Sequence, residues 1–153
     1  MRKLFLLLFL VPLFAFSQLK DIKIIIPKDF GYSFFDFVQF LPGEKNFAVC
    51  SNALTIFNTE TSEVIDEIDL PYLAKNLSIN RTGDLLMVCA NNELVIFSFK
   101  DQKLQTVFKT NSAELIKGLP NSEYYGALHI SGCFFTGKGN LIYVSVGTFT
   151  LIY

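Results

Sequence analysis

The sequence predicts an all-β protein in which four-stranded antiparallel meanders follow one another along the chain. The segment that begins at Gly43, GEKNFAVCSNALTIFNTETSEVIDEIDL, is echoed by GDLLMVCANNELVIFSFKDQKLQTVF, which begins at Gly83. A third and weaker echo, GNLIYVSVGTFTLIY, begins at Gly139. A period of about 40 residues is typical of proteins whose β-sheets stack on one another and bury a shared core.

The first repeat covers residues 33–70 and has the pattern of four strands. Apolar runs bounded by turn residues place these strands at 35–41, 47–50, 54–57 and 63–70. A Pro-Gly pair, a Ser-Asn pair and a polar stretch supply the turns between them. The continuous apolar run at 47–50 predicts a strand covered on both faces. Acidic residues fill the last strand, which suits an exposed sheet edge.

The second repeat, residues 76–109, follows the same pattern. Its strands are expected at 76–80, 85–90, 93–99 and 104–109. The sequence Leu-Thr-Ile-Phe at 54–57 recurs as Leu-Val-Ile-Phe at 94–97, and a two-residue Asn-Asn turn precedes the second copy. Turns of two to five residues join all four strands, so the repeat is predicted to be one antiparallel meander.

The third repeat, residues 128–153, is incomplete. It follows an interruption at 110–127, in which residues 113–119 fit a short helical turn and a loop equally well. Three strands are expected, at 129–135, 141–146 and 149–153. The extra residues fall in the connection between repeats, where insertions are best tolerated. Because the third repeat stops before its fourth strand, we expect the sequence to be the N-terminal part of a longer protein.

The N-terminus has the layout of a secretory signal peptide, which would be a helix before its removal. Arg2 and Lys3 precede an apolar stretch, and Ala15 and Ser17 are small residues at the −3 and −1 positions of a cleavage site after Ser17. We expect an exported protein, periplasmic or secreted, with no membrane contact after cleavage. No cysteine stands at the cleavage site, which excludes a lipoprotein signal. Residues 18–32 then contain a leading strand.

Composition excludes some partners. Without residues 1–17 the chain has 11 Lys and Arg against 14 Asp and Glu, a net charge of −3. A mildly acidic chain without a basic patch does not fit nucleic-acid binding. Hydrophobic residues make up 51% of the sequence, which favours a folded core over disorder.

The cysteines have the pattern of small core residues. Cys50 and Cys89 stand at matching places in the first two repeats, and Cys133 stands in the third. Unpaired cysteine is among the most buried residue types, so core positions are favoured. A disulfide is compatible with export, and an odd number of cysteines would then leave one thiol over. The redox state of all three stays open, and their spacing does not suggest zinc.

These repeats resemble the WD-repeat family and related bacterial β-propellers. Turns such as PGEK and RTGD lead into an apolar strand, and a later strand ends in an apolar-aromatic pair. The pairs are Ile56-Phe57, Ile96-Phe97 and Ile152-Tyr153, where the family often has Trp-Asp. The resemblance covers residues 33–153 and implies a partial, open β-propeller of two to three blades, because a closed ring needs about four to eight.

No residue pattern predicts catalysis, a metal or a cofactor. His129 is the one histidine in the chain, and Cys133 lies near it in sequence, but their spacing supports no catalytic pair. Five acidic residues gather in the first repeat without the spacing of a calcium loop; they are Glu60, Glu63, Asp66, Glu67 and Asp69. The Gly-Lys-Gly sequence at 137–139 is better explained as a turn than as a phosphate loop.

The leading functional hypothesis is an exported β-propeller scaffold that binds a protein, peptide or glycan, with no catalysis of its own. Loops on a rigid repeat scaffold commonly carry recognition, and the 110–127 insertion is the best local candidate. Tyr124 and Tyr125 within it are candidate binding residues, or else they cap a repeat. The alternative is the N-terminal propeller of a longer hydrolase, prolyl-oligopeptidase-like or caspase-like, whose catalytic domain would lie beyond residue 153.

Overall fold

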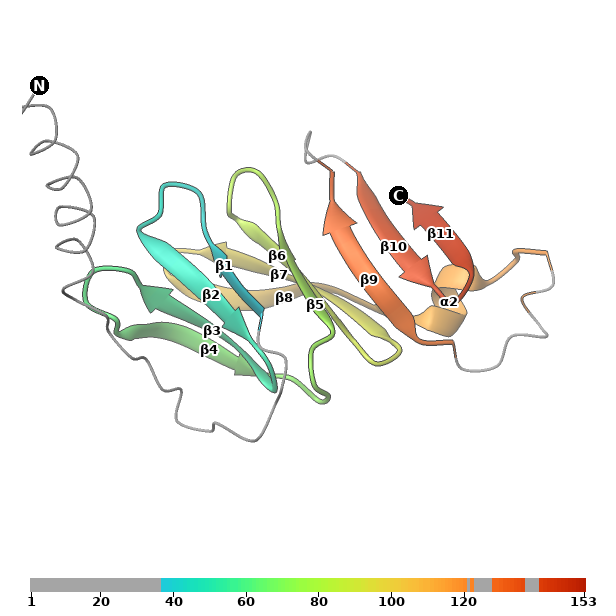
Figure 1. The fold of residues 1–153 in the computed structure, drawn as a ribbon, viewed down its shortest axis with the longest axis horizontal. Coiled ribbons are helices and arrows are strands. Elements are labelled where there is room, and N and C mark those ends of the chain that lie inside the picture. The colour runs from blue at the N-terminus through green and yellow to red at the C-terminus, as the bar shows by residue number, and fades with distance from the viewer. Residues whose placement is uncertain (1–36, 121, 123–127, 137–140) are drawn as a thin grey trace, which may run out of the picture. The chain divides into compact units, whose positions relative to one another are not determined.

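A computed structural model describes residues 37–120, 122, 128–136 and 141–153 (Figure 1). The predicted signal peptide and the leading strand of residues 18–32 lie outside these residues. Among the described residues no helix is both long and apolar enough to span a membrane.

Three antiparallel sheets make up the described part of the chain, and in each sheet the strands are neighbours in chain order. The first sheet contains β1 (Phe37–Phe40), β2 (Asn46–Cys50), β3 (Ala53–Asn58) and β4 (Val64–Asp69). The second contains β5 (Asn76–Ile79), β6 (Leu85–Ala90), β7 (Glu93–Lys100) and β8 (Lys103–Asn111). The third contains β9 (Ile130–Phe135), β10 (Ile142–Val146) and β11 (Phe149–Ile152). The prediction of successive meanders is confirmed.

A short helix, α2 (Ser112–Ile116), follows β8 directly. Its N-cap residue is Asn111, whose Oδ1 accepts a hydrogen bond from the Glu114 backbone N–H at 3.0 Å. Asparagine is a favoured N-cap because its side chain replaces a missing backbone acceptor. The helix is anchored in the core by Ile116, and Leu115 O accepts a hydrogen bond from the Tyr153 hydroxyl at 3.0 Å. Of the two possibilities left open for this segment, the helical turn is correct.

Strand register confirms that the repeats are equivalent. Cys50 lies opposite Leu54 across β2 and β3, and Cys89 lies opposite Leu94 across β6 and β7. Both cysteines are fully buried, as expected of small core residues. The same equivalence extends to the third sheet, where Ile152 lies opposite Tyr143 in the place that Ile96 takes opposite Met87.

The second sheet is buried on both faces. One face, with Leu86, Val88 and Phe97, shares a core with Leu54 and Ile56 of the first sheet. The other face, with Met87, Cys89 and Leu94, shares a second core with the third sheet. The continuous apolar run at 85–90 is therefore explained, because neither side of β6 meets water.

The sequence predicted that the strand at 47–50 is covered on both faces, and β2 of the first sheet differs from that prediction. Ala48 and Cys50 are fully buried in the core shared with the second sheet, whereas Phe47 and Val49, on the opposite face, are only half-buried. Val38 and Phe40 of β1 share that opposite face and are 61% and 56% exposed. The run at 47–50 is thus apolar on both faces and fully covered on one.

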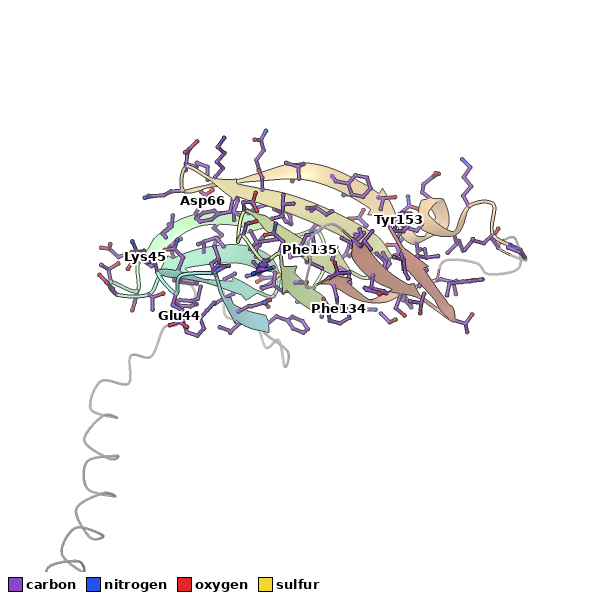
Figure 2. All side chains as sticks on the ribbon, turned by 90° about the horizontal axis from the view of Figure 1, so that it is seen from above. Glu44, Lys45, Asp66, Phe134, Phe135 and Tyr153 are labelled. Atoms are coloured by element: carbon purple, nitrogen blue, oxygen red, sulfur yellow. The ribbon has the colours of Figure 1, made fainter. Side chains whose placement is uncertain are left out.

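The acidic strand β4 contributes to packing between the first two sheets. Asp66, which is labelled in Figure 2, accepts a hydrogen bond from the Leu104 backbone N–H at 2.7 Å and another from Lys103 Nζ at 3.3 Å, and both donors are on β8. The hydrogen bond from the Leu104 N–H is the main cause of the lowered pKa of Asp66, and Lys103 lowers this pKa further. The side chain is therefore a bridge between sheets, although the sequence predicted a solvated edge.

Replacement of Asp66 by Asn should weaken this bridge. The variant keeps an acceptor but loses the charge-assisted bond, so the free energy of unfolding at pH 7 should fall by about 1 kcal/mol. Because the pKa of Asp66 is lowered in the folded state, the stability that its charge contributes is present above the unfolded pKa of about 3.9. That stability is lost as the pH falls through the folded pKa.

Urea unfolding at pH 7 and pH 3 measures both effects. The wild type should lose more stability than the variant between these pH values. Asp69→Asn, an exposed position on the same strand, is the control, and equal acid sensitivity of wild type and Asp66→Asn would contradict the bridge.

Two equivalent glycines hold the first turn of each of the first two repeats. Gly43 and Gly83 have φ angles of 85° and 81°, a region that residues with a Cβ rarely adopt. Their surroundings differ. A Cβ on Gly43 would meet no atom within 4 Å, whereas one on Gly83 would lie 2.6 Å from Pro42 Cδ. Pro42 belongs to the turn of the first sheet, so this contact joins neighbouring repeats.

The two glycines form a matched pair for mutation. Gly43→Ala should destabilise the chain by about 1–2 kcal/mol through backbone strain alone. Gly83→Ala should destabilise it by about 1–3 kcal/mol more, since Pro42 must also move. Gly83→Val adds further bulk at the same contact and should destabilise at least as much as Gly83→Ala. Urea denaturation of the three variants measures their free energies of unfolding and so checks the predicted order. Equal losses of stability in the two alanine variants would show that Pro42 can move away from the added Cβ without cost.

Candidate binding edge

The connections between sheets all leave from one edge of the fold. Each four-stranded meander returns the chain to the edge that carries its β2–β3 or β6–β7 turn, so the β4–β5 and β8–β9 connections lie there as well (Figure 1). We call this the connection edge, and its described parts are residues 51–52, 70–75, 91–92, 112–120, 122, 128–129 and 147–148.

Backbone hydrogen bonds fix the β4–β5 connection on this edge. The Leu70 N–H donates to Asn52 O and the Ala74 N–H to Ser51 O, each at 2.8 Å. The Lys75 N–H then donates to Cys89 O of the second sheet, also at 2.8 Å. The side chain of Ala74 is buried. The connection is thereby tied at both ends, which restricts how residues 71–73 can move.

The β8–β9 connection is tied in the same way to the next turn. The Ser112 N–H donates to Asn92 O at 2.7 Å, and the Ile130 N–H donates to Asn91 O at 3.0 Å. The Gly147 N–H donates to His129 O at 3.2 Å. Both ends of the 110–127 insertion therefore start from a fixed backbone. Tyr124 and Tyr125, the predicted binding residues, lie outside the described residues.

In the β4–β5 connection, two large apolar side chains are exposed to solvent, Tyr72 and Leu73. They are 48% and 57% exposed, and they lie between the tethers at Leu70 and Ala74. The sequence interpretation overlooked them. The signal was the triplet Pro71-Tyr72-Leu73, an apolar insertion in a connection where polar residues are expected. Its significance depends on topology, because only the sheet order places these residues on the same edge as the 110–127 insertion.

Buried thiols meet between the second and third sheets. Cys133 Sγ donates to Asn76 Oδ1 at 3.5 Å and to Met87 O at 3.9 Å, and Asn76 lies directly opposite Cys89. Neither Cys89 nor Cys133 forms a disulfide, and both thiols are buried. The neighbouring Cys89 thiol and burial raise the pKa of Cys133 well above its usual range.

A raised pKa is the opposite of what a thiol nucleophile needs, since the reactive species is the thiolate. His129 is exposed, whereas Cys133 is fully buried. The structure therefore gives Cys133 a packing role at the junction of two sheets.

The acidic residues of the first repeat are spread over different surfaces. Asp66 and Glu67 point to opposite faces of β4, and Glu67 Oε2 accepts a hydrogen bond from Thr55 Oγ1 at 2.7 Å. Glu60, Glu63 and Asp69 are exposed. In the described ranges no group of three or more His, Cys, Asp and Glu side chains is placed to hold a metal ion.

Comparison with known proteins supports the architecture. No family model and no curated protein matches the sequence. Among solved structures, the C-terminal WD40 domain of Sif2 superimposes with a TM-score of 0.61 at 10% identity, over 76% of this chain and 32% of that one. The Cps50 (Swd1) β-propeller domain of Myceliophteria thermophila gives 0.59 at 15% identity, over 76% and 38%. Hydrazine synthase of Kuenenia stuttgartiensis gives 0.55 at 14% identity, over 81% and 32%.

The fold is that of a partial β-propeller of the WD-repeat-like type. The chain spans about a third of the length of these neighbours. At such low sequence identity the likeness concerns the fold alone, and what the connection edge binds is a separate question.

Proposed function

We propose that this chain is an exported β-propeller scaffold that binds a protein, peptide or glycan at its connection edge. The observation that carries the proposal is the exposed pair Tyr72 and Leu73, which is held on a tethered backbone at the edge that also carries the 110–127 insertion. The neighbours of WD40 type support a scaffold role.

Physical chemistry favours these two residues as contacts. Tyrosine combines a large apolar ring with a hydroxyl that can form a hydrogen bond, and it is enriched among the residues that dominate binding energy. A tethered connection loses less conformational entropy on binding than a mobile loop does. A peptide with an apolar anchor, a protein surface of the same character, or a sugar ring against the tyrosine would satisfy this edge.

Binding can be tested with residues 18–153 and two defined probe sets, a displayed peptide library and a glycan array. For the best ligand found, the double change Tyr72→Ala and Leu73→Ala should weaken affinity at least tenfold, or about 1.4 kcal/mol. Val107→Ala is the matched control, because Val107 is 53% exposed on β8 and lies away from the connection edge. Calorimetry measures both. Equal affinities of the double variant and the wild type would place the site elsewhere, and failure of both probe sets to bind would contradict the proposed function.

Export has its own test. Expression of the whole sequence in a bacterial host should yield a processed protein that begins at Gln18, because the leader contains a positive start, an apolar stretch and small residues before the cut. Mass spectrometry of the extracytoplasmic fraction measures this. Ala15→Leu together with Ser17→Leu should block processing, and recovery of an intact N-terminus from the unmodified sequence would contradict export.

A further inference from the structure

Two buried cysteines from different sheets lie beside the same backbone. The strand β9, which carries Cys133, lies next to β5 and β6 (Figure 1). The Cys133 Sγ is 3.5 Å from Asn76 Oδ1 and 3.9 Å from Met87 O. Asn76 is directly opposite Cys89 in the β5–β6 ladder. Met87 and Cys89 are two residues apart on β6, so their side chains point to the same face. The Cys133 sulfur therefore lies beside Cys89.

Burial separates this pair from the third cysteine of the chain. Cys89 and Cys133 are fully buried in the core between the second and third sheets. Cys50 is also fully buried, but it lies in the core between the first and second sheets. The second sheet stands between these two cores, because alternate side chains of β6 enter one core or the other. Three cysteines allow three pairings, and the fold favours one of them.

We propose that Cys89 and Cys133 form a disulfide bond when the chain folds in an oxidising compartment, and that this bond fixes the third sheet to the second. In the structure both side chains are thiols. Export, proposed above, would supply the oxidising compartment. The pairing itself follows from the fold and does not depend on what the connection edge binds.

The oxidant in this step is an organic disulfide, such as oxidised glutathione. The thiolate of one cysteine attacks a sulfur of the oxidant, which forms a mixed disulfide and displaces the first oxidant thiolate. The thiolate of the other cysteine then attacks the protein sulfur of the mixed disulfide. This second attack forms the Cys89–Cys133 bond and displaces the second oxidant thiolate. The two protons of the protein thiols end on the displaced thiolates, and the two electrons that the protein sulfurs lose reduce the oxidant to two thiols.

Burial determines when this exchange takes place. Both cysteines are inaccessible in the folded chain, and the raised pKa of Cys133 lowers the fraction of its reactive thiolate. Oxidation should therefore be fast before the third sheet packs on the second and slow once it has packed. A mixed disulfide with a molecule of the size of glutathione does not fit a close-packed core, so packing favours the internal bond.

The bond would close a loop over residues 89–133. This loop contains β7, β8, α2 and the whole 110–127 insertion. A cross-link of this kind stabilises a fold chiefly because it restricts the unfolded chain. Both ends of the insertion, which are already held by backbone hydrogen bonds at Ser112 and Ile130, would then belong to one covalent ring.

Refolding of residues 18–153 in a buffer of reduced and oxidised glutathione tests the pairing. Trypsin cleaves after Lys and Arg, which places the three cysteines on separate peptides, residues 46–75, 82–100 and 118–138. Mass spectrometry without reduction should find peptide 82–100 linked to peptide 118–138 as the dominant link, with the thiol of peptide 46–75 intact. The urea midpoint of the linked chain should be higher than that of the same chain after reduction.

Cys50→Ala is the matched control, because it removes the cysteine of the other core, and this variant should keep the link. Cys133→Ala should lose both the link and the difference between the two midpoints, and Cys89→Ala replaces it if that variant does not fold. Oxidation in concentrated urea is a second control. Without the fold, links through Cys50 should become common, because the 50–89 loop is about as long as the 89–133 loop.

Three outcomes of the refolding experiment would overturn the proposal. They are a native chain that retains all three thiols, one that carries a mixed disulfide with glutathione, and one in which Cys50 is linked. Equal urea midpoints of the linked and the reduced chain would overturn the second part of the proposal, since the bond would then not hold the third sheet to the second.

Discussion

Coverage of both faces of the second sheet is the constraint on which the rest of the fold depends. All residues of β6 from Leu86 to Ala90 are buried, although successive side chains of a strand point in opposite directions. Each large aliphatic side chain gains about 1.5–3 kcal/mol when it leaves water. Leu86 and Val88 are buried against the first sheet, and Met87 is buried against the third. A single meander with the composition of the second sheet would expose two apolar faces, so the sheets stabilise one another.

This constraint also fixes where a binding surface can be. Because the meander has an even number of strands, each connection to the next sheet leaves from the same edge as the β2–β3 and β6–β7 turns. The hydrogen bonds from Ala74 to Ser51 and from Lys75 to Cys89 tie one connection to two sheets at once. Exposed positions of a connection, such as Tyr72 and Leu73, can therefore change without altering either core, whereas Ala74 and Ile116 are core residues.

The sequence predicted what depends on local pattern. The run at 85–90 coincides with β6, since a strand covered on both faces requires a continuous apolar stretch between two turns. The same reasoning placed Cys50 and Cys89 in the core. It failed where a contact joins distant residues. The bond between Asp66 and the Leu104 N–H crosses two sheets, and nothing in an acidic strand distinguishes a bridge from a solvated edge.

The candidate site was harder to predict for the same reason. Tyr72 and Leu73 stand in an ordinary short connection, and their common edge with the 110–127 insertion follows from the order of eight strands. The helix α2 was predictable in part, because one of its determinants is local and another is not. Its N-cap, Asn111, is visible in the sequence, but the strand that delivers it extends two residues beyond the predicted end at 109.

The repeats share a backbone pattern, yet their faces differ in polarity according to what covers them. In the first two sheets, positions that pack against the next sheet carry Cys and Leu, namely Cys50, Leu54, Cys89 and Leu94, whereas Ser145 and Thr150 occupy the equivalent positions in the third sheet. Ser131 Oγ donates to Ser145 Oγ at 3.0 Å, so part of this polarity is satisfied within the sheet itself. Hydroxyls reduce the free-energy cost of leaving a face in water, because they keep hydrogen bonds that an apolar side chain cannot make. The outer face of the third sheet is therefore more polar than the equivalent faces of the first two sheets.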